Sequence, residues 1–140
     1  MSDNIATTIR GYLKYRGQGH YAFLMHRISG LATFIFLTLH IATTSTVFLA
    51  PSWYDALIQI FRNPIVMVGE IIMAFFVVYH GVNGFRIAYN DLFHHELWAK
   101  ASTRTALAYV FITAFVLWLP ALGILGYNLL RSSLGLFGGE

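Results

Sequence analysis

The sequence predicts an all-α membrane protein with three transmembrane helices. Of its 140 residues, 57% are hydrophobic and only 11% are charged, whereas a soluble domain averages about 25% charged residues. Three apolar segments are each long enough to cross roughly 30 Å of hydrocarbon. The chain lacks the polar surface that a water-soluble fold needs, so we expect a single membrane domain over residues 1–140.

The three predicted spans follow from the distribution of charged side chains. The first covers about residues 23–50, and its part from 28 to 50 has no acidic or basic side chain except His40. At about 1.5 Å per residue this part alone crosses the hydrocarbon. The second span covers about residues 65–89 and contains Glu70 and His80. The third covers about residues 105–130 and contains Pro120, which is expected to kink it.

Polar segments precede, connect and follow these spans. Residues 1–22 form a polar, basic N-terminal segment, and residues 51–55 predict a turn with interfacial aromatic side chains. Residues 90–103 form a polar connector, in which the adjacent His94 and His95 are interpreted as loop residues. Residues 131–140 form a short glycine-rich tail.

The basic residues predict the orientation in the membrane. The side with the N-terminus and the second connector carries Arg10, Lys14, Arg16, Arg27, Arg86, Lys100 and Arg104. The other side carries Arg62 and Arg131. The positive-inside rule therefore places residues 1–22 in the cytoplasm and the tail outside. The N-terminus resembles neither a cleaved signal nor a transit peptide, which favours a multi-pass protein of a prokaryotic inner (cytoplasmic) membrane.

The chain contains no cysteine, which excludes a disulfide framework, a thiolate-held iron–sulfur cluster and covalent c-type haem attachment. It also lacks the Gly-x-Gly-x-x-Gly fingerprint of dinucleotide binding. Flavin or iron–sulfur chemistry would therefore belong to partner subunits. No nucleic-acid partner is expected.

Two histidines lie within the predicted spans, where a polar group is costly and indicates function. Counted from the outer ends of their spans, His40 and His80 lie roughly 15 Å and 24 Å deep at about 1.5 Å per residue. A haem held by two histidines needs both ligands at nearly the same depth, so a difference of about 9 Å argues against one haem shared by this pair. We expect each histidine to pair with a histidine of another subunit, at two levels of a larger helical bundle.

The neighbours of His80 suit a large flat ligand. Gly84 lies on the same helical face and leaves room for a porphyrin. His26, Arg27 and Arg86 lie at the cytoplasmic edge, where their cationic side chains would attract haem propionates.

Simpler interpretations remain open for each residue. A membrane histidine can hydrogen-bond to a backbone carbonyl, and a glycine such as Gly84 often serves helix packing alone. Arg27 and Arg86 could be plain cytoplasmic anchors. Glu70 could be a proton-path carboxylate near the outer haem or could extend to the membrane surface.

Two motifs carry a resemblance to a known family. Residues 26–30 read His-Arg-Ile-Ser-Gly, and residues 80–86 read His-Gly-Val-Asn-Gly-Phe-Arg with Asp91 five positions on. With three spans, these motifs resemble the cytochrome b membrane-anchor C subunits of succinate dehydrogenases, the succinate:quinone oxidoreductases, over roughly residues 12–130. The resemblance implies that His80 is an axial ligand of haem b.

The resemblance further implies that Arg27 lines a quinone site at the cytoplasmic face, with Asp91 close by. His40 resembles the first-span histidine of members that carry two haems. Members with one haem often have a quinone-contacting serine three residues before the first-motif histidine, whereas this chain has Phe23. Ser29 is the substitute quinone contact that we predict.

The function implied is that of the haem b anchor of complex II in the tricarboxylic acid cycle. Electrons from succinate would pass through a flavoprotein with FAD and an iron–sulfur subunit to a quinone. This chain and a second membrane-anchor subunit would share two haems in the lipid, and this chain alone would not be catalytic. The alternatives are a haem-free structural anchor, the equivalent subunit of a fumarate reductase, and a small transporter or proton-pathway subunit.

Overall fold

The computed structural model describes residues 18–93 and 104–134, which form four α-helices and contain no strand. The helices are α2 (Gln18–Leu49), α3 (Pro51–Phe61), α4 (Pro64–Phe93) and α5 (Arg104–Leu134). Three segments, Tyr21–Leu49, Pro64–Phe93 and Thr105–Ser133, are long and apolar enough to cross a membrane. The prediction of an all-α protein with three transmembrane helices is confirmed.

The three long helices extend beyond the predicted spans. α2 begins at Gln18, before the predicted start at 23, while α4 continues to Phe93 and α5 to Leu134. Hydropathy marks only the part of a helix that lies in hydrocarbon, whereas backbone hydrogen bonding continues into the polar edge. Pro120 lies inside α5, which remains one helix.

The turn predicted at residues 51–55 is wrong, because this segment begins the 11-residue helix α3. Ala50 has φ −156° and ψ 75°, which breaks the helical path after α2. Pro51 then occupies the first turn of α3, where its fixed φ suits a helix and its missing N–H costs nothing. Proline and aromatic residues were interpreted as a turn, but they start a helix here.

The start of α4 uses the same device with a side-chain cap. The Asn63 side-chain oxygen accepts a hydrogen bond of 2.9 Å from the backbone N–H of Ile65. Pro64 is the first helical residue. Asparagine as the cap followed by proline is a favourable helix start, and it fixes where α4 leaves α3.

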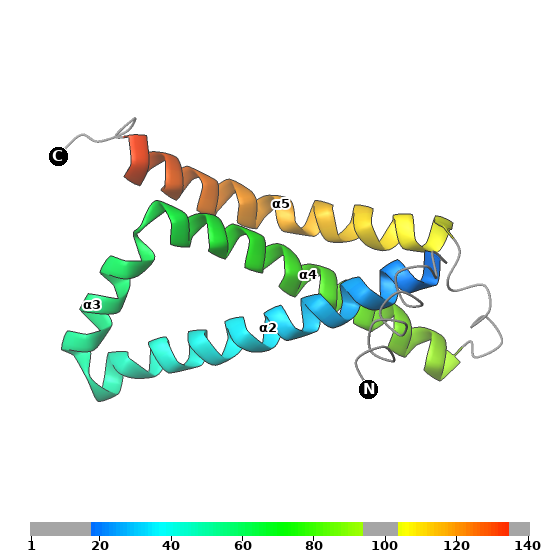
Figure 1. The fold of residues 1–140 in the computed structure, drawn as a ribbon, viewed down its shortest axis with the longest axis horizontal. Helices are drawn as coiled ribbons and strands as arrows, with labels where there is room; N and C mark the ends of the chain where they lie inside the picture. The colour runs from blue at the N-terminus through cyan, green and yellow to red at the C-terminus, as the bar shows by residue number, and fades with distance from the viewer. Residues whose placement is uncertain (1–17, 94–103, 135–140) are drawn as a thin grey trace, which may run out of the picture.

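α4 is the central helix and contacts α2, α3 and α5. Figure 1 shows that α2 and α4 cross near the start of α2 and then diverge. α3 joins their far ends, so the three helices outline a triangle, and α5 runs beside α4.

The described core lies between α4 and α5. Tyr79 of α4 is buried with Val110 and Ala114 of α5, and Met25 of α2 packs against this cluster. Farther along, the indole N–H of Trp118 donates a 3.0 Å hydrogen bond to a backbone carbonyl of α4. These contacts hold α5 against α4 over much of its length.

Small side chains permit the crossing of α2 and α4. Ala22, Ser29 and Ala32 are the buried residues on the described part of α2. Their spacing places them on one side of the helix, and small residues let two membrane helices approach closely.

Several predictions fall on residues 1–17, 94–103 and 135–140, which lie outside the described residues. They concern most of the N-terminal segment, most of the second connector and the end of the tail. The basic residues Arg10, Lys14, Arg16 and Lys100 belong to this part, as do His94 and His95.

Candidate functional site

Two histidines from different helices lie face to face where α2 crosses α4. The ring centroids of His26 and His80 are 4.3 Å apart, and the ring planes differ by 9°. The sequence predicted His80 as a ligand and His26 as its neighbour in a haem environment. The structure brings these two side chains into direct contact, and we call them the histidine pair.

The ring of His80 lies over the backbone of α2 at Gly30. A Cβ atom at Gly30 would lie 2.9 Å from Cε1 of His80 and 3.3 Å from Nδ1. A separation under 3.0 Å is one that real Cβ atoms essentially never show. Glycine at this position is therefore what allows the His80 ring to lie between the two helices.

Gly84 has a different neighbour from the one predicted. A Cβ there would lie 3.7 Å from Cε1 of His26, an ordinary contact distance. A Cβ at Gly81 would meet nothing within 4 Å. Gly84 therefore adjoins the His26 ring across the helix crossing, and Gly30 is the glycine that makes room for His80.

The hydrogen bonds of His80 define its tautomer. Nδ1 lies 3.2 Å from the carbonyl oxygen of His26 and 3.4 Å from the hydroxyl of Ser29. Because a carbonyl only accepts, Nδ1 carries the proton. Nε2 is then the nitrogen with the free lone pair, and within the described residues it has no hydrogen-bond partner.

Fully buried polar side chains surround the histidine pair. Tyr79, Asn83 and Ser29 are the largest fully buried side chains of the described chain. Two of them flank His80 in sequence, and the third follows His26 by three positions. Polar groups enclosed in this way inside membrane spans are typical of functional sites.

Ser29 was predicted to contact a quinone, but its side chain is enclosed. Its exposed fraction is 0%. The hydroxyl donates a 3.0 Å hydrogen bond to the His26 carbonyl. In this conformation it faces His80 and is covered by protein.

The predicted edge residues lie at different places around the crossing. The Arg27 side chain is exposed, and its guanidinium carbon lies 5.1 Å from the ring centroid of Phe23. Asp91 is exposed near the end of α4. Arg86 lines a cavity of about 370 Å³ between α4 and α5, together with Tyr89 and Tyr109.

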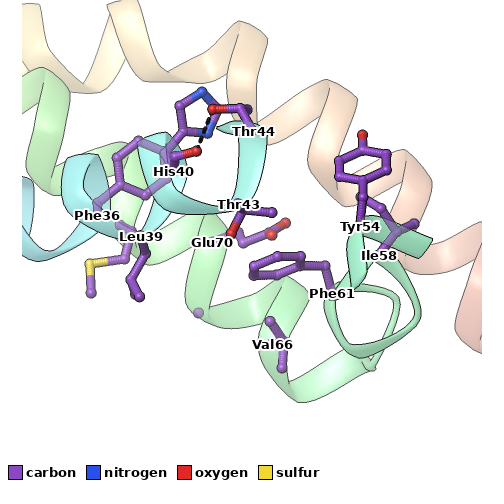
Figure 2. Close-up of a pocket in the computed structure, with 12 residues that line it drawn as sticks. Phe36, Leu39, His40, Thr43, Thr44, Tyr54, Ile58, Phe61, Val66 and Glu70 are labelled. Atoms are coloured by element: carbon purple, nitrogen blue, oxygen red, sulfur yellow. Dashed lines mark hydrogen bonds between the residues drawn. The ribbon is translucent and has the colours of Figure 1, made fainter. Parts of the chain in front are cut away.

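His40 lines a second cavity, of about 450 Å³, enclosed by α2, α3 and α4. Most of its lining is apolar or aromatic, and the polar residues are His40, Thr43, Thr44, Tyr54 and Glu70. Figure 2 shows the His40 ring at the edge of the group and Glu70 pointing toward Thr43.

The immediate contacts of His40 are few. Its ring stacks on Phe36 with centroids 5.7 Å apart. The Thr44 hydroxyl donates a 2.7 Å hydrogen bond to the backbone carbonyl of His40, as drawn in Figure 2. The imidazole itself is exposed on the described chain, so it is accessible to a ligand or a neighbouring helix.

His40 and His80 lie at different levels. Gly30 lies under His80, and ten residues separate Gly30 from His40 on α2. Ten residues likewise separate Glu70 from His80 on α4. Each interval corresponds to about 15 Å along a helix. This separation exceeds the 9 Å obtained from the predicted span ends, because the spans neither begin nor end where those ends were placed.

Sequence reasoning missed the role of Gly30 and the contribution of α3 to the His40 cavity. Gly30 belongs to the first motif, so its fixed spacing from His26 was visible, but its contact with His80 depends on the register of α2 against α4. That register follows from α3, which was interpreted as a turn. Tyr54 of α3 lines the cavity for the same reason.

Comparisons with known proteins agree with these motifs. The family model of the succinate dehydrogenase/fumarate reductase transmembrane subunit matches residues 9–121, which include both histidine sites. The succinate dehydrogenase 2 membrane subunit SdhC of Mycobacterium tuberculosis (strain ATCC 25618 / H37Rv) is 33% identical over 78 residues. That match covers 55% of this chain and 57% of the relative's own length. The predicted resemblance is confirmed, and the chain belongs to the family of succinate dehydrogenase/fumarate reductase transmembrane subunits.

Proposed function

We propose that this chain is the haem b-binding membrane anchor of a succinate dehydrogenase, with His80 as an axial ligand. The observation that carries the proposal is the hydrogen bonding of the His80 ring, whose Nδ1 is 3.2 Å from a backbone carbonyl. Metal-binding histidines commonly donate their second ring N–H to such a group, which fixes the ring and leaves Nε2 for the metal. His80 has this arrangement inside a membrane span.

The surroundings of His80 suit this ligand. His26 supports one face of the ring, and Gly30 leaves room for its edge. Arg27 and Arg86 supply cations for carboxylate groups near the same end of α2 and α4. Gly84 keeps the ring of His26 close to the helix crossing.

Bound haem with two histidine ligands supplies one-electron transfer, because no iron position remains open. The part of this chain is to hold one side of the group through His80. The opposing ligand would be a histidine of the second membrane-anchor subunit, which would complete the helical bundle.

A second haem would be held by His40. Support comes from the largely apolar cavity of about 450 Å³ that His40 lines and from the exposed imidazole. The level of His40, about 15 Å along α2 from that of His80, is too far for a shared iron. Two haems would then lie one above the other, each shared with the partner anchor.

The quinone would bind near the start of α2, where Arg27 and Asp91 are accessible. Electrons from succinate would arrive from a flavoprotein and an iron–sulfur subunit on the cytoplasmic side of an inner membrane. The surplus of basic residues at this end of the spans supports that orientation. Ser29 is enclosed and fits a different role, argued below.

The equivalent subunit of a fumarate reductase is the second candidate function, because the matching family includes both enzymes. Direction of electron flow separates the two: the purified complex should reduce a quinone with succinate faster than it oxidises a quinol with fumarate. A haem-free anchor and a proton-pathway subunit are distinguished by the absence of a reduced b-type absorption band.

The test is a reduced-minus-oxidised spectrum and a haem-to-protein ratio of the purified complex. We expect two haems per copy of this chain, one lost in His80→Ala and the other in His40→Ala. A ratio of one, with His40→Ala unchanged, would remove His40 as a ligand. Loss of the same haem in both variants would contradict the two-level arrangement, and a wild-type complex without a b-type band would refute the haem proposal altogether.

A further inference from the structure

We propose that Ser29 is a positioning residue that holds the His80 imidazole in its ligating tautomer, and that it does not contact the quinone. The proposal rests on the haem ligation by His80 proposed above. It assigns a role to a buried hydroxyl that the two sequence motifs leave open.

The geometry is a three-centre arrangement on one turn of α2. The Ser29 hydroxyl donates to the His26 carbonyl at 3.0 Å. Its oxygen lies 3.4 Å from Nδ1 of His80, while the carbonyl lies 3.2 Å from the same nitrogen. The Nδ1–H of His80 therefore has two acceptors, and the hydroxyl proton is already committed to the carbonyl.

This commitment determines which way the hydroxyl acts. A serine hydroxyl can donate or accept, but once its proton is on the carbonyl, its oxygen faces His80 as an acceptor. An acceptor at Nδ1 stabilises the tautomer in which Nε2 is bare. It also makes the imidazole a stronger electron donor to a metal, which favours the oxidised metal.

Enclosure argues against a direct quinone contact. The Ser29 side chain has 0% exposure, whereas Arg27, two positions earlier on the same helix, is exposed. Ser29 lines neither of the two cavities described above. A quinone could reach Ser29 only if the contact between α2 and α4 opened.

The experiment compares variants of the whole complex in two separate readouts. Ser29→Ala removes the hydroxyl, Ser29→Cys replaces it with a weak acceptor of similar shape, and Ser29→Thr retains it. Ser45→Ala is the matched control, because the Ser45 hydroxyl donates to a carbonyl of its own helix at 2.7 Å, far from His80. The readouts are the midpoint potential of each b haem and the KM for quinone.

We expect Ser29→Ala and Ser29→Cys to raise the midpoint potential of the haem that His80→Ala removes. Loss of such a supporting bond typically weakens a metal site by about 10- to 100-fold. The lower end applies here since the carbonyl bond remains, and tenfold equals about 59 mV for a one-electron couple. Ser29→Thr and Ser45→Ala should keep the wild-type potential, and the KM for quinone should not change in any variant.

Three results would overturn the role of Ser29. An unchanged potential with a raised KM would make it a quinone contact, and unchanged values of both would make it a packing residue. If Ser29→Ala does not assemble, Ser29→Cys decides, and a wild-type potential in that variant refutes the proposal. These outcomes all require a b-type band in the wild-type complex, so they are distinct from failure of the haem proposal, in which that band is missing.

Discussion

Replacing Gly30 by alanine should displace the His80 ring. The new Cβ would lie 2.9 Å from Cε1 of His80. The ring cannot simply move away, because its face stacks on His26 and its Nδ1 is hydrogen-bonded. Either the imidazole leaves its hydrogen bonds or α2 and α4 separate at their crossing.

The magnitude follows from two opposing effects. Alanine in place of a helical glycine stabilises a helix by about 0.5–1 kcal/mol. Overpacking a close contact costs about 1–3 kcal/mol. The balance is a loss of about 1–2 kcal/mol, which lowers the melting temperature by roughly 2–8 °C. The His80 haem should also be depleted, since its ligand is misplaced.

Two other glycines provide matched controls in the same assay. Gly84→Ala introduces a contact of 3.7 Å, and Gly81→Ala introduces none within 4 Å. Thermal denaturation of the purified complexes, with haem content measured in parallel, should therefore rank Gly30→Ala as the most damaging and Gly81→Ala as neutral or stabilising. Equal melting temperatures for the three variants, or full haem content in Gly30→Ala, would refute the placement of His80 over Gly30.

Three further predictions concern other parts of the chain. Trp118→Phe removes the 3.0 Å hydrogen bond to α4 and should cost about 0.5–1.5 kcal/mol in thermal denaturation, whereas Trp53→Phe, at a side chain 70% exposed, should cost almost nothing. Arg27→Ala should raise the KM for quinone with haem content unchanged, and Phe23→Ala, which removes only the ring under the guanidinium, serves as its control. Glu70→Gln removes a carboxylate from the His40 cavity, so redox titration should show a higher potential for the haem on His40 alone; an equal shift of both haems would contradict the separation of the two levels.

Composition and hydropathy were sufficient to predict the three spans. Long uncharged segments have few alternatives to crossing a membrane, so the existence of these helices did not depend on tertiary contacts. Their ends were less predictable, because the helical backbone continues past the hydrocarbon edge. α3 was missed since Pro51 favours a turn and a helix start alike.

The candidate site was predictable as a set of residues but not as an arrangement. His26, Ser29, Gly30 and His80 all belong to the two motifs. Which glycine adjoins which histidine depends on the register between α2 and α4. The burial of Ser29 depends on the same register, and for this reason a fully enclosed side chain was assigned to an open quinone pocket.

The triangle formed by α2, α3 and α4 (Figure 1) separates two geometric variables. The crossing point is one vertex, and α3 is the side opposite to it. Lengthening or shortening α3, which spans about 16 Å as 11 residues, would widen or narrow the angle between α2 and α4. The displacement would grow with distance from the crossing, so the His40 cavity would change volume while the vertex at His80 stayed fixed. Insertions or deletions in α3 can therefore resize one chamber of the protein without altering the other.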